Sequence, residues 1–228
     1  MMPEHTHSIS MLRLYQLVSP ALPVGAYNFS QGLEYAVHAG WVRDECSVLQ
    51  WIIGVAENAI ATLDVPLVLR MHAAWSDEDE VLARRWSAYL LASRESEELR
   101  AEERHLGRSL AKILMSLELT QAGSFIKDTN TSYACMFALA SSHWKIDGIQ
   151  TANAYVWAWC ENQVLAALKL LAIGQTAGQR MLDALLQRIP ALVQHASTIA
   201  DEDIGVAAPR LGMASAWHET QYSRLFRS

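Results

Sequence analysis

The chain has 228 residues, 51% of them hydrophobic and 18% charged, so it can bury a core of its own without needing a disulfide or a metal ion to fold. Its net charge of -6 argues against binding to nucleic acid or to an anionic membrane surface, since neither attracts an acidic chain. No signal peptide or bilayer-spanning segment is predicted, and Cys46, Cys135 and Cys160 suit buried, reduced thiols in a cytoplasmic protein.

Helical spacing of apolar residues runs through the first part of the chain. Apolar side chains recur every three to four residues in three segments, which predicts helices at 9–18, 33–41 and 49–63. Between the first two, residues 19–25 contain two prolines and a glycine, which cannot continue a helix. A rigid turn is therefore expected after the first helix.

Acidic residues mark the helix starts in the middle of the chain. Asp64 with Pro66 predicts a new helix there, because proline fits a first turn, where its missing N–H is no loss. The acidic run at 76–79 predicts a cap for the helix that follows it. Residues 95–104 place opposite charges three and four residues apart, which predicts an exposed helix face.

The rest of the chain is also helical in pattern. A loop is expected at 123–131, followed by helices at 133–144, 149–172, 176–189 and 191–200. The helix at 149–172 has small residues and few charges on any face, so we expect it at the centre of the fold. No strand pattern is persuasive. We predict an all-α fold, a single-domain helical bundle of about nine or ten helices.

No segment carries the pattern of a catalytic, nucleotide or metal site. The glycine-containing run at 174–180 lacks the lysine and hydroxyl of a phosphate-binding loop, and the histidines lack metal-ligand spacing. Glu34 is the one acid in residues 27–34, and we expect it to make a buried structural hydrogen bond rather than to act as a general base. We therefore predict a protein that is not an enzyme and binds no cofactor or metal of its own.

The end of the chain has the composition of a binding surface. Residues 214–228 are rich in Trp, Tyr, Phe and Arg, the side chains that contribute most at protein interfaces. The alternative, a last helix docked on its own core, fits the composition as well. We predict a partner-binding tail at 205–228 and a mobile N-terminus at 1–8.

Four blocks of sequence stand out in order along the chain: LVSPALPVGAYNFSQGLE at 17–34, SRESEELR with GRSL at 93–100 and 107–110, GQTAGQR at 174–180, and HETQYSRLFRS at 218–228. Together they resemble the UreF family of urease accessory proteins. The resemblance implies a non-catalytic, all-α urease maturation chaperone that forms a homodimer and binds the accessory protein UreD, also called UreH. Through it the chain would recruit the nickel-carrying GTPase UreG to apo-urease, with nickel and GTP belonging to these partners.

The resemblance also assigns partner-binding residues. Tyr27 and Trp157 match positions of GTPase-facing or dimer-facing aromatics, although Trp157 fits a core position equally well. Glu34 is included in the predicted set. The tail residues that resemble the family's UreD-contacting and locking segment are His218, Glu219, Tyr222, Arg224 and Leu225.

Two mechanisms follow from these assignments. In the first, partner binding orders the first helix and the tail, and the ordered face completes the platform on which the GTPase docks. In the alternative, the protein activates or gates the GTPase, and Arg224 or another exposed arginine enters the partner's nucleotide site to stabilise charge on the transferring phosphoryl group.

Overall fold

The computed structural model describes residues 4–228, and these residues are mainly helical, with no strand among them. The α-helical segments are α1 (Glu4–Val18), α2 (Leu33–His38), α3 (Glu45–Val55), α4 (Val65–Ser76), α5 (Glu80–Ser93), α6 (Glu97–Ser116), α7 (Tyr133–His143), α8 (Gly148–Leu170), α9 (Gln175–Leu186), α10 (Ile189–Ala196) and α11 (Pro209–His218). Short 3₁₀ turns are η1 (Ala26–Asn28), η3 (Thr120–Phe125) and η4 (Asp201–Asp203). Because α3 and α4 are joined by η2 (Ala56–Asp64) into one helix, the eleven segments make ten separate helices, which confirms the predicted all-α fold.

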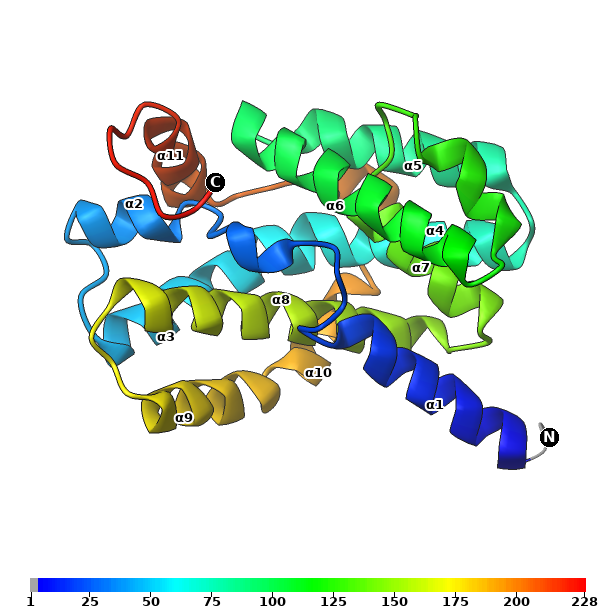
Figure 1. The fold of residues 1–228 in the computed structure, drawn as a ribbon, viewed down its shortest axis with the longest axis horizontal. Coiled ribbons are helices and arrows are strands. Elements are labelled where there is room, and N and C mark those ends of the chain that lie inside the picture. The colour runs from blue at the N-terminus through cyan, green and yellow to red at the C-terminus, as the bar shows by residue number, and fades with distance from the viewer. Residues whose placement is uncertain (1–3) are drawn as a thin grey trace.

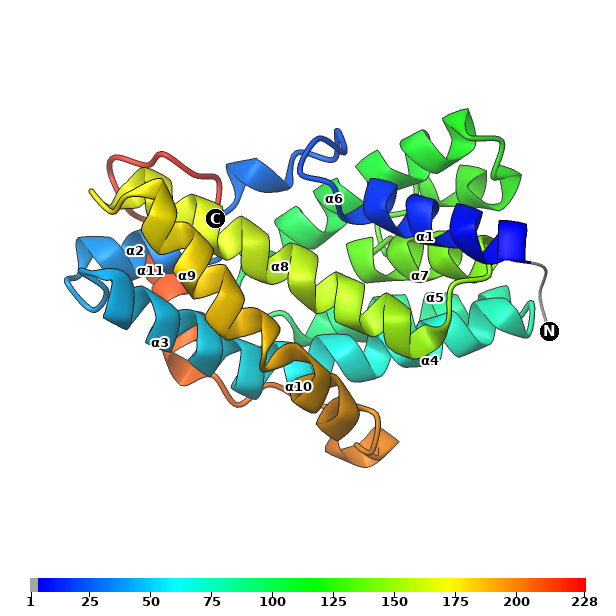
Figure 2. The same ribbon diagram turned by 90° about the horizontal axis from the view of Figure 1, so that it is seen from below.

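Helix α8 lies between two apolar clusters, and the ribbon views show it running between α6 on one side and α9 on the other (Figures 1 and 2). Tyr155 on one side of α8 packs into a cluster built mainly by α4, α6 and α7. Val156 and Cys160 on another side pack into a cluster built with α2, α3, α9 and α10. The expectation that this helix is central is therefore confirmed.

The predicted helix start at Asp64 is wrong, because the helix continues through it. Residues 56–64 widen into a π-helix, in which the Val65 N–H donates to the Ile60 carbonyl, five residues back. Pro66 has no N–H to give, and the wider turn accommodates it without a break. Two backbone N–H groups of the distant segment 205–207 donate to carbonyls of the π-helix, from Gly205 to Thr62 and from Ala207 to Asn58.

This long helix, Glu45–Ser76, is the one helix among the described residues that is apolar and long enough to cross a membrane. However, 67% of its apolar window is buried inside the protein, as expected of a core helix.

Two other expectations need correction. The charged segment 95–104 is not simply an exposed face, because Glu102 and Glu103 are buried, at 3% and 5% exposure. Cys46 is exposed, whereas Cys135 and Cys160 are buried as expected, and burial raises the pKa of both buried thiols to about 12. The expected cap before α5 is confirmed, since the Asp79 carboxylate accepts the Leu82 N–H at 2.9 Å.

Helix α1 and helix α11 lie toward opposite ends of the molecule (Figure 1). Helix α1 leaves a stripe of apolar side chains exposed, at Ile9, Leu12 and Tyr15. The predicted mobility of residues 1–8 stays a prediction: residues 1–3 lie outside the described part, and α1 begins at Glu4.

Candidate functional site

The C-terminal segment, residues 205–228, docks along the body of the protein. Helix α11 packs against α2 and α6, and the chain after it returns toward η1 (Figure 1). There the Ser30 N–H and hydroxyl both donate to the Ser228 carbonyl, at 2.8 and 2.5 Å, and the Arg227 N–H donates to the Asn28 carbonyl. Phe226 and Ser228 are buried. The segment is therefore docked on the protein's own core, as in the alternative given from the sequence.

A cluster of four charged side chains, which we call the histidine cluster, fastens the segment: Glu34, Glu98, His218 and Arg224. The fully buried His218 ring has Nε2 3.0 Å from a Glu34 oxygen and Nδ1 2.7 Å from a Glu98 oxygen. The second oxygen of Glu98 accepts Arg224 at 2.6 Å. Glu34 and Glu98 thus each hold the C-terminal segment through at least one of its side chains.

Glu34 holds the segment by its backbone as well. Its two oxygens accept the N–H groups of Leu225 and Phe226, at 2.6 and 2.9 Å. The expected buried structural hydrogen bond at Glu34 is confirmed. All of these contacts join α2, near the start of the chain, to its end.

Glu219 fastens the segment at a third point, the start of α6. Its carboxylate accepts the N–H groups of Glu97 and Glu98, at 2.9 and 3.3 Å. These are first-turn N–H groups without a partner inside the helix, and they lie at its positive end. Glu219 thus caps α6 from another part of the chain.

Several apolar side chains of the segment are exposed, although Leu211 and Phe226 are buried. Tyr222 is fully exposed, Leu225 is 64% exposed and Met213 is 44% exposed. Trp217, 42% exposed, packs against Tyr35 and Trp41, with ring centroids 5.4 and 5.9 Å apart. Exposed apolar side chains on a backbone held in place by hydrogen bonds are typical of a protein interaction surface.

Tyr27 lies beside the end of the C-terminal segment, and Trp157 does not. Lys169 Nζ lies 5.5 Å from the centroid of the exposed Tyr27 ring and 5.5 Å from that of Phe226, so one cation joins the two. Trp157 is half-buried against the second apolar cluster, about three turns of α8 away from Lys169. The predicted residues therefore form one group around the segment, with Trp157 apart.

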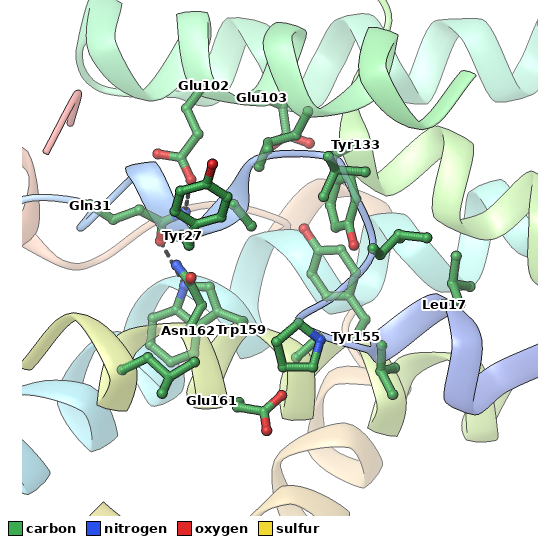
Figure 3. A pocket seen from close by; sticks show the side chains of 18 of the residues that line it. Leu17, Tyr27, Gln31, Glu102, Glu103, Tyr133, Tyr155, Trp159, Glu161 and Asn162 are labelled. Carbon is green, nitrogen blue, oxygen red and sulfur yellow. Dashed lines mark hydrogen bonds between the residues drawn. The ribbon is translucent and has the colours of Figure 1, made fainter. Parts of the chain in front are cut away.

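A cavity of about 100 Å³ opens beneath the η1 loop, between α6 and α8 (Figure 3). Glu102 at its wall accepts the Gln31 amide at 2.8 Å and the Ser228 hydroxyl at 2.7 Å. Gln31 in turn accepts Trp159 Nε1 at 2.6 Å. Burial raises the pKa of Glu102 to about 7, against the lowering effect of its bonds from Ser228 and Gln31. The last residue of the segment is thus tied to the cavity wall.

A second set of charges, the arginine cluster, lies deeper in the body. Arg94 donates to Asp64 at 2.5 and 3.1 Å and to Glu103 at 2.8 Å. Burial disfavours the guanidinium charge, but Asp64 and Glu103 outweigh it and hold the Arg94 pKa above its usual value. Tyr155 also donates to Asp64, and burial raises the pKa of its hydroxyl. Among the side chains that the structure describes, residues 8–228, no three His, Cys, Asp or Glu are placed to hold a metal ion.

The sequence had not indicated Glu98, Glu102, Gln31 or Lys169 as parts of this site. A signal for the acids was present in the helical phase of α6. Its buried leucines at 99, 106 and 110 define one face, and residues 102 and 103 fall on that same face. An acid at such a position has to be paired or neutral.

Comparison with known proteins gives matches over the whole chain. The family model described as UreF matches residues 42–186. A protein of Alkalilimnicola ehrlichii named Urease accessory protein UreF is 45% identical over 228 residues, covering 100% of both chains. Urease accessory protein UreF 2 of Brucella anthropi is 44% identical, again over 100% of both chains. Urease accessory protein UreF of Teredinibacter turnerae is 44% identical over 96% of this chain and 98% of its own.

Proposed function

The chain belongs to the UreF family of urease accessory proteins, and from this premise we propose that it acts in urease maturation as a non-catalytic scaffold. In this proposal it binds a UreD (UreH) homologue through the C-terminal segment and recruits the nickel-carrying GTPase UreG to apo-urease. Nickel and GTP belong to those partners. The protein works in the cytoplasm, where reducing conditions keep the buried Cys135 and Cys160 as thiols.

The observation that carries this proposal is the orientation of the C-terminal segment. His218, Glu219, Arg224 and two backbone N–H groups of the segment are engaged by Glu34, Glu98 and the start of α6, and these contacts fix its position. Tyr222 and Leu225 are left free to face a partner. A docked segment presents these side chains at a fixed spacing, which lowers the entropy cost of binding. Partner binding and docking of the segment then favour each other.

The same geometry favours the scaffold over a GTPase-activating role. An arginine that enters a partner's nucleotide site has to project freely from the surface. Arg224 instead pairs with Glu98 at 2.6 Å, and its side chain is only 40% exposed. If Arg224→Ala abolishes complex formation while the partner's GTP turnover stays intact, the scaffold role is supported. A turnover defect in an intact complex would support the alternative.

The direct experiment is capture of a purified UreD homologue by the full chain and its variants. Deletion of residues 220–228, and separately Tyr222→Ala combined with Leu225→Ala, should each weaken capture about tenfold or more, because exposed aromatic and aliphatic anchors dominate interface energies. Val81→Ala is the matched control, since Val81 is 80% exposed on α5. Undiminished capture by the double variant would contradict the role of this surface.

A homodimer is the remaining part of the proposal. Trp157 is half-buried on α8, away from the C-terminal segment, so it is free to serve a second interface. Trp157→Ala should lower the mass measured by light scattering toward that of one chain while leaving capture of the UreD homologue in place. A purely core role would instead destabilise the fold without changing the oligomeric state.

A further inference from the structure

The His218 ring lies between two carboxylates, one at each ring nitrogen. Neutral imidazole carries a single N–H and can donate to only one of them, whereas the doubly protonated ring donates to both. With Nε2 at 3.0 Å from Glu34 and Nδ1 at 2.7 Å from Glu98, a neutral ring would aim a lone pair at a carboxylate in a site without water contact. The geometry therefore matches an imidazolium.

The charges facing this ring support the same assignment. Glu34 on α2 and Glu98 on α6 face it directly, and Arg224 of the C-terminal segment pairs with the other oxygen of Glu98. Two carboxylates and one guanidinium leave one negative charge, which a proton on His218 cancels. The nearby acids Glu219 and Glu102 contact the start of α6 and the pair Gln31 and Ser228, respectively, and neither contacts the His218 ring. An unpaired charge in a buried site is costly.

We propose that docking of the C-terminal segment is linked to a proton on His218: the segment is fastened while the ring is doubly protonated and loosens when the ring loses one proton. The segment is then a proton-dependent latch, and the surface it presents is available only while the latch is closed. This inference concerns the chain alone and stands whether or not a partner binds there.

Glu102 acts on the same segment and has to be separated from His218. Its pKa is raised by burial, so it also loses a proton as the pH rises, and it contacts Ser228 at the end of the segment. The Glu102→Gln variant removes that titration and leaves the histidine cluster untouched. A latch controlled by His218 keeps its pH dependence in Glu102→Gln.

The first test is nitrogen NMR of the full chain labelled with ¹⁵N-histidine. The chain has eight histidines, so the His218 signals are assigned by their loss in His218→Gln. At about pH 7 both ring nitrogens of His218 should show the shifts of protonated nitrogen. One protonated and one bare nitrogen, with the segment still docked, would overturn the proposal.

The second test measures hydrogen exchange of the segment in the wild-type chain and in Glu102→Gln. After correction for intrinsic exchange, protection of the amides of Leu225 and Phe226 should fall about tenfold across the pH range in which the ring-nitrogen shifts of His218 report loss of a proton, relative to the α4 and α7 core amides. The same fall should occur in Glu102→Gln. Protection that does not change with pH, or a fall that Glu102→Gln abolishes, would contradict a latch set by His218.

Discussion

The arginine cluster and the histidine cluster each compensate the charge of two buried carboxylates, but they do so with different cations. In each, one buried cation lies between two carboxylates: Arg94 between Asp64 and Glu103, and His218 between Glu34 and Glu98. Arg94 is 10% exposed by its side chain and His218 is 0% exposed, so neither pair can rely on water. The two clusters differ in whether the cation can lose its charge.

The location of each cation matches its chemistry. Arg94 connects η2 to α6, two elements of the body, and a guanidinium keeps its charge at every pH a protein meets. His218 connects α11 to α2 and α6, and an imidazole titrates near neutral pH in ordinary surroundings. A fixed cation therefore holds the permanent core, and a titratable one holds the segment that we expect to serve a partner.

The largest effect is expected from removing the fixed cation. Arg94→Met leaves Asp64 and Glu103 buried without a partner, and breaking a buried pair in this way costs about 3–5 kcal/mol of unfolding free energy. Urea denaturation measures it. Arg180→Met is the control, because Arg180 pairs with Glu45 at the exposed surface, and its urea midpoint should stay nearly unchanged. Equal losses in the two variants would remove the distinction between buried and exposed pairs.

A smaller effect is expected in the pH dependence of stability, through Glu102. Burial raises its pKa from the model-peptide value of 4.5 to about 7, so the folded state favours the protonated acid. Its stabilising contribution is complete below pH 4.5 and is lost as the pH rises through about 7. Relative to Glu102→Gln, the wild type should lose about 2 kcal/mol of unfolding free energy between about pH 5 and about pH 8.

Urea denaturation at several pH values checks this, and parallel stability curves for the two proteins would contradict it. The result also sharpens the comparison of the clusters. Whatever pH dependence the C-terminal segment keeps in Glu102→Gln cannot come from this acid.

Most helices of the fold were predicted from the sequence because apolar spacing and capping residues lie within or beside each helix. Apolar spacing located α8, and the acidic residue Asp79 marked the start of α5. The rule that proline starts a helix failed at Pro66, because the carbonyls set free by the π-helix are satisfied by Gly205 and Ala207, far along the chain. Only the folded chain brings these groups together.

The candidate site was predictable on one side only. The resemblance to the UreF family indicated His218, Glu219 and Arg224 as partner-contacting residues, and in the structure all three make contacts that fasten the segment. Their partners on α6 were missed because Glu98 and Glu102 lie in a charged stretch that is typical of a solvent face. The helical phase of α6 places Glu102 on its buried face, but Glu98 is covered by His218 and Arg224 of the C-terminal segment, and spacing along the chain does not contain that information.

The smallest effect is expected at Glu219, which fastens the segment without touching His218. Glu219→Gln keeps an acceptor for the Glu97 N–H but removes the negative charge at the start of α6, so unfolding free energy should fall by no more than about 1 kcal/mol. Hydrogen exchange should quicken at the first turn of α6 and in the C-terminal segment. Its dependence on pH should remain that of the wild type, because the ring still lies between Glu34 and Glu98. A loss of pH dependence in this variant would assign the proton to Glu219 and remove the contrast between the two clusters.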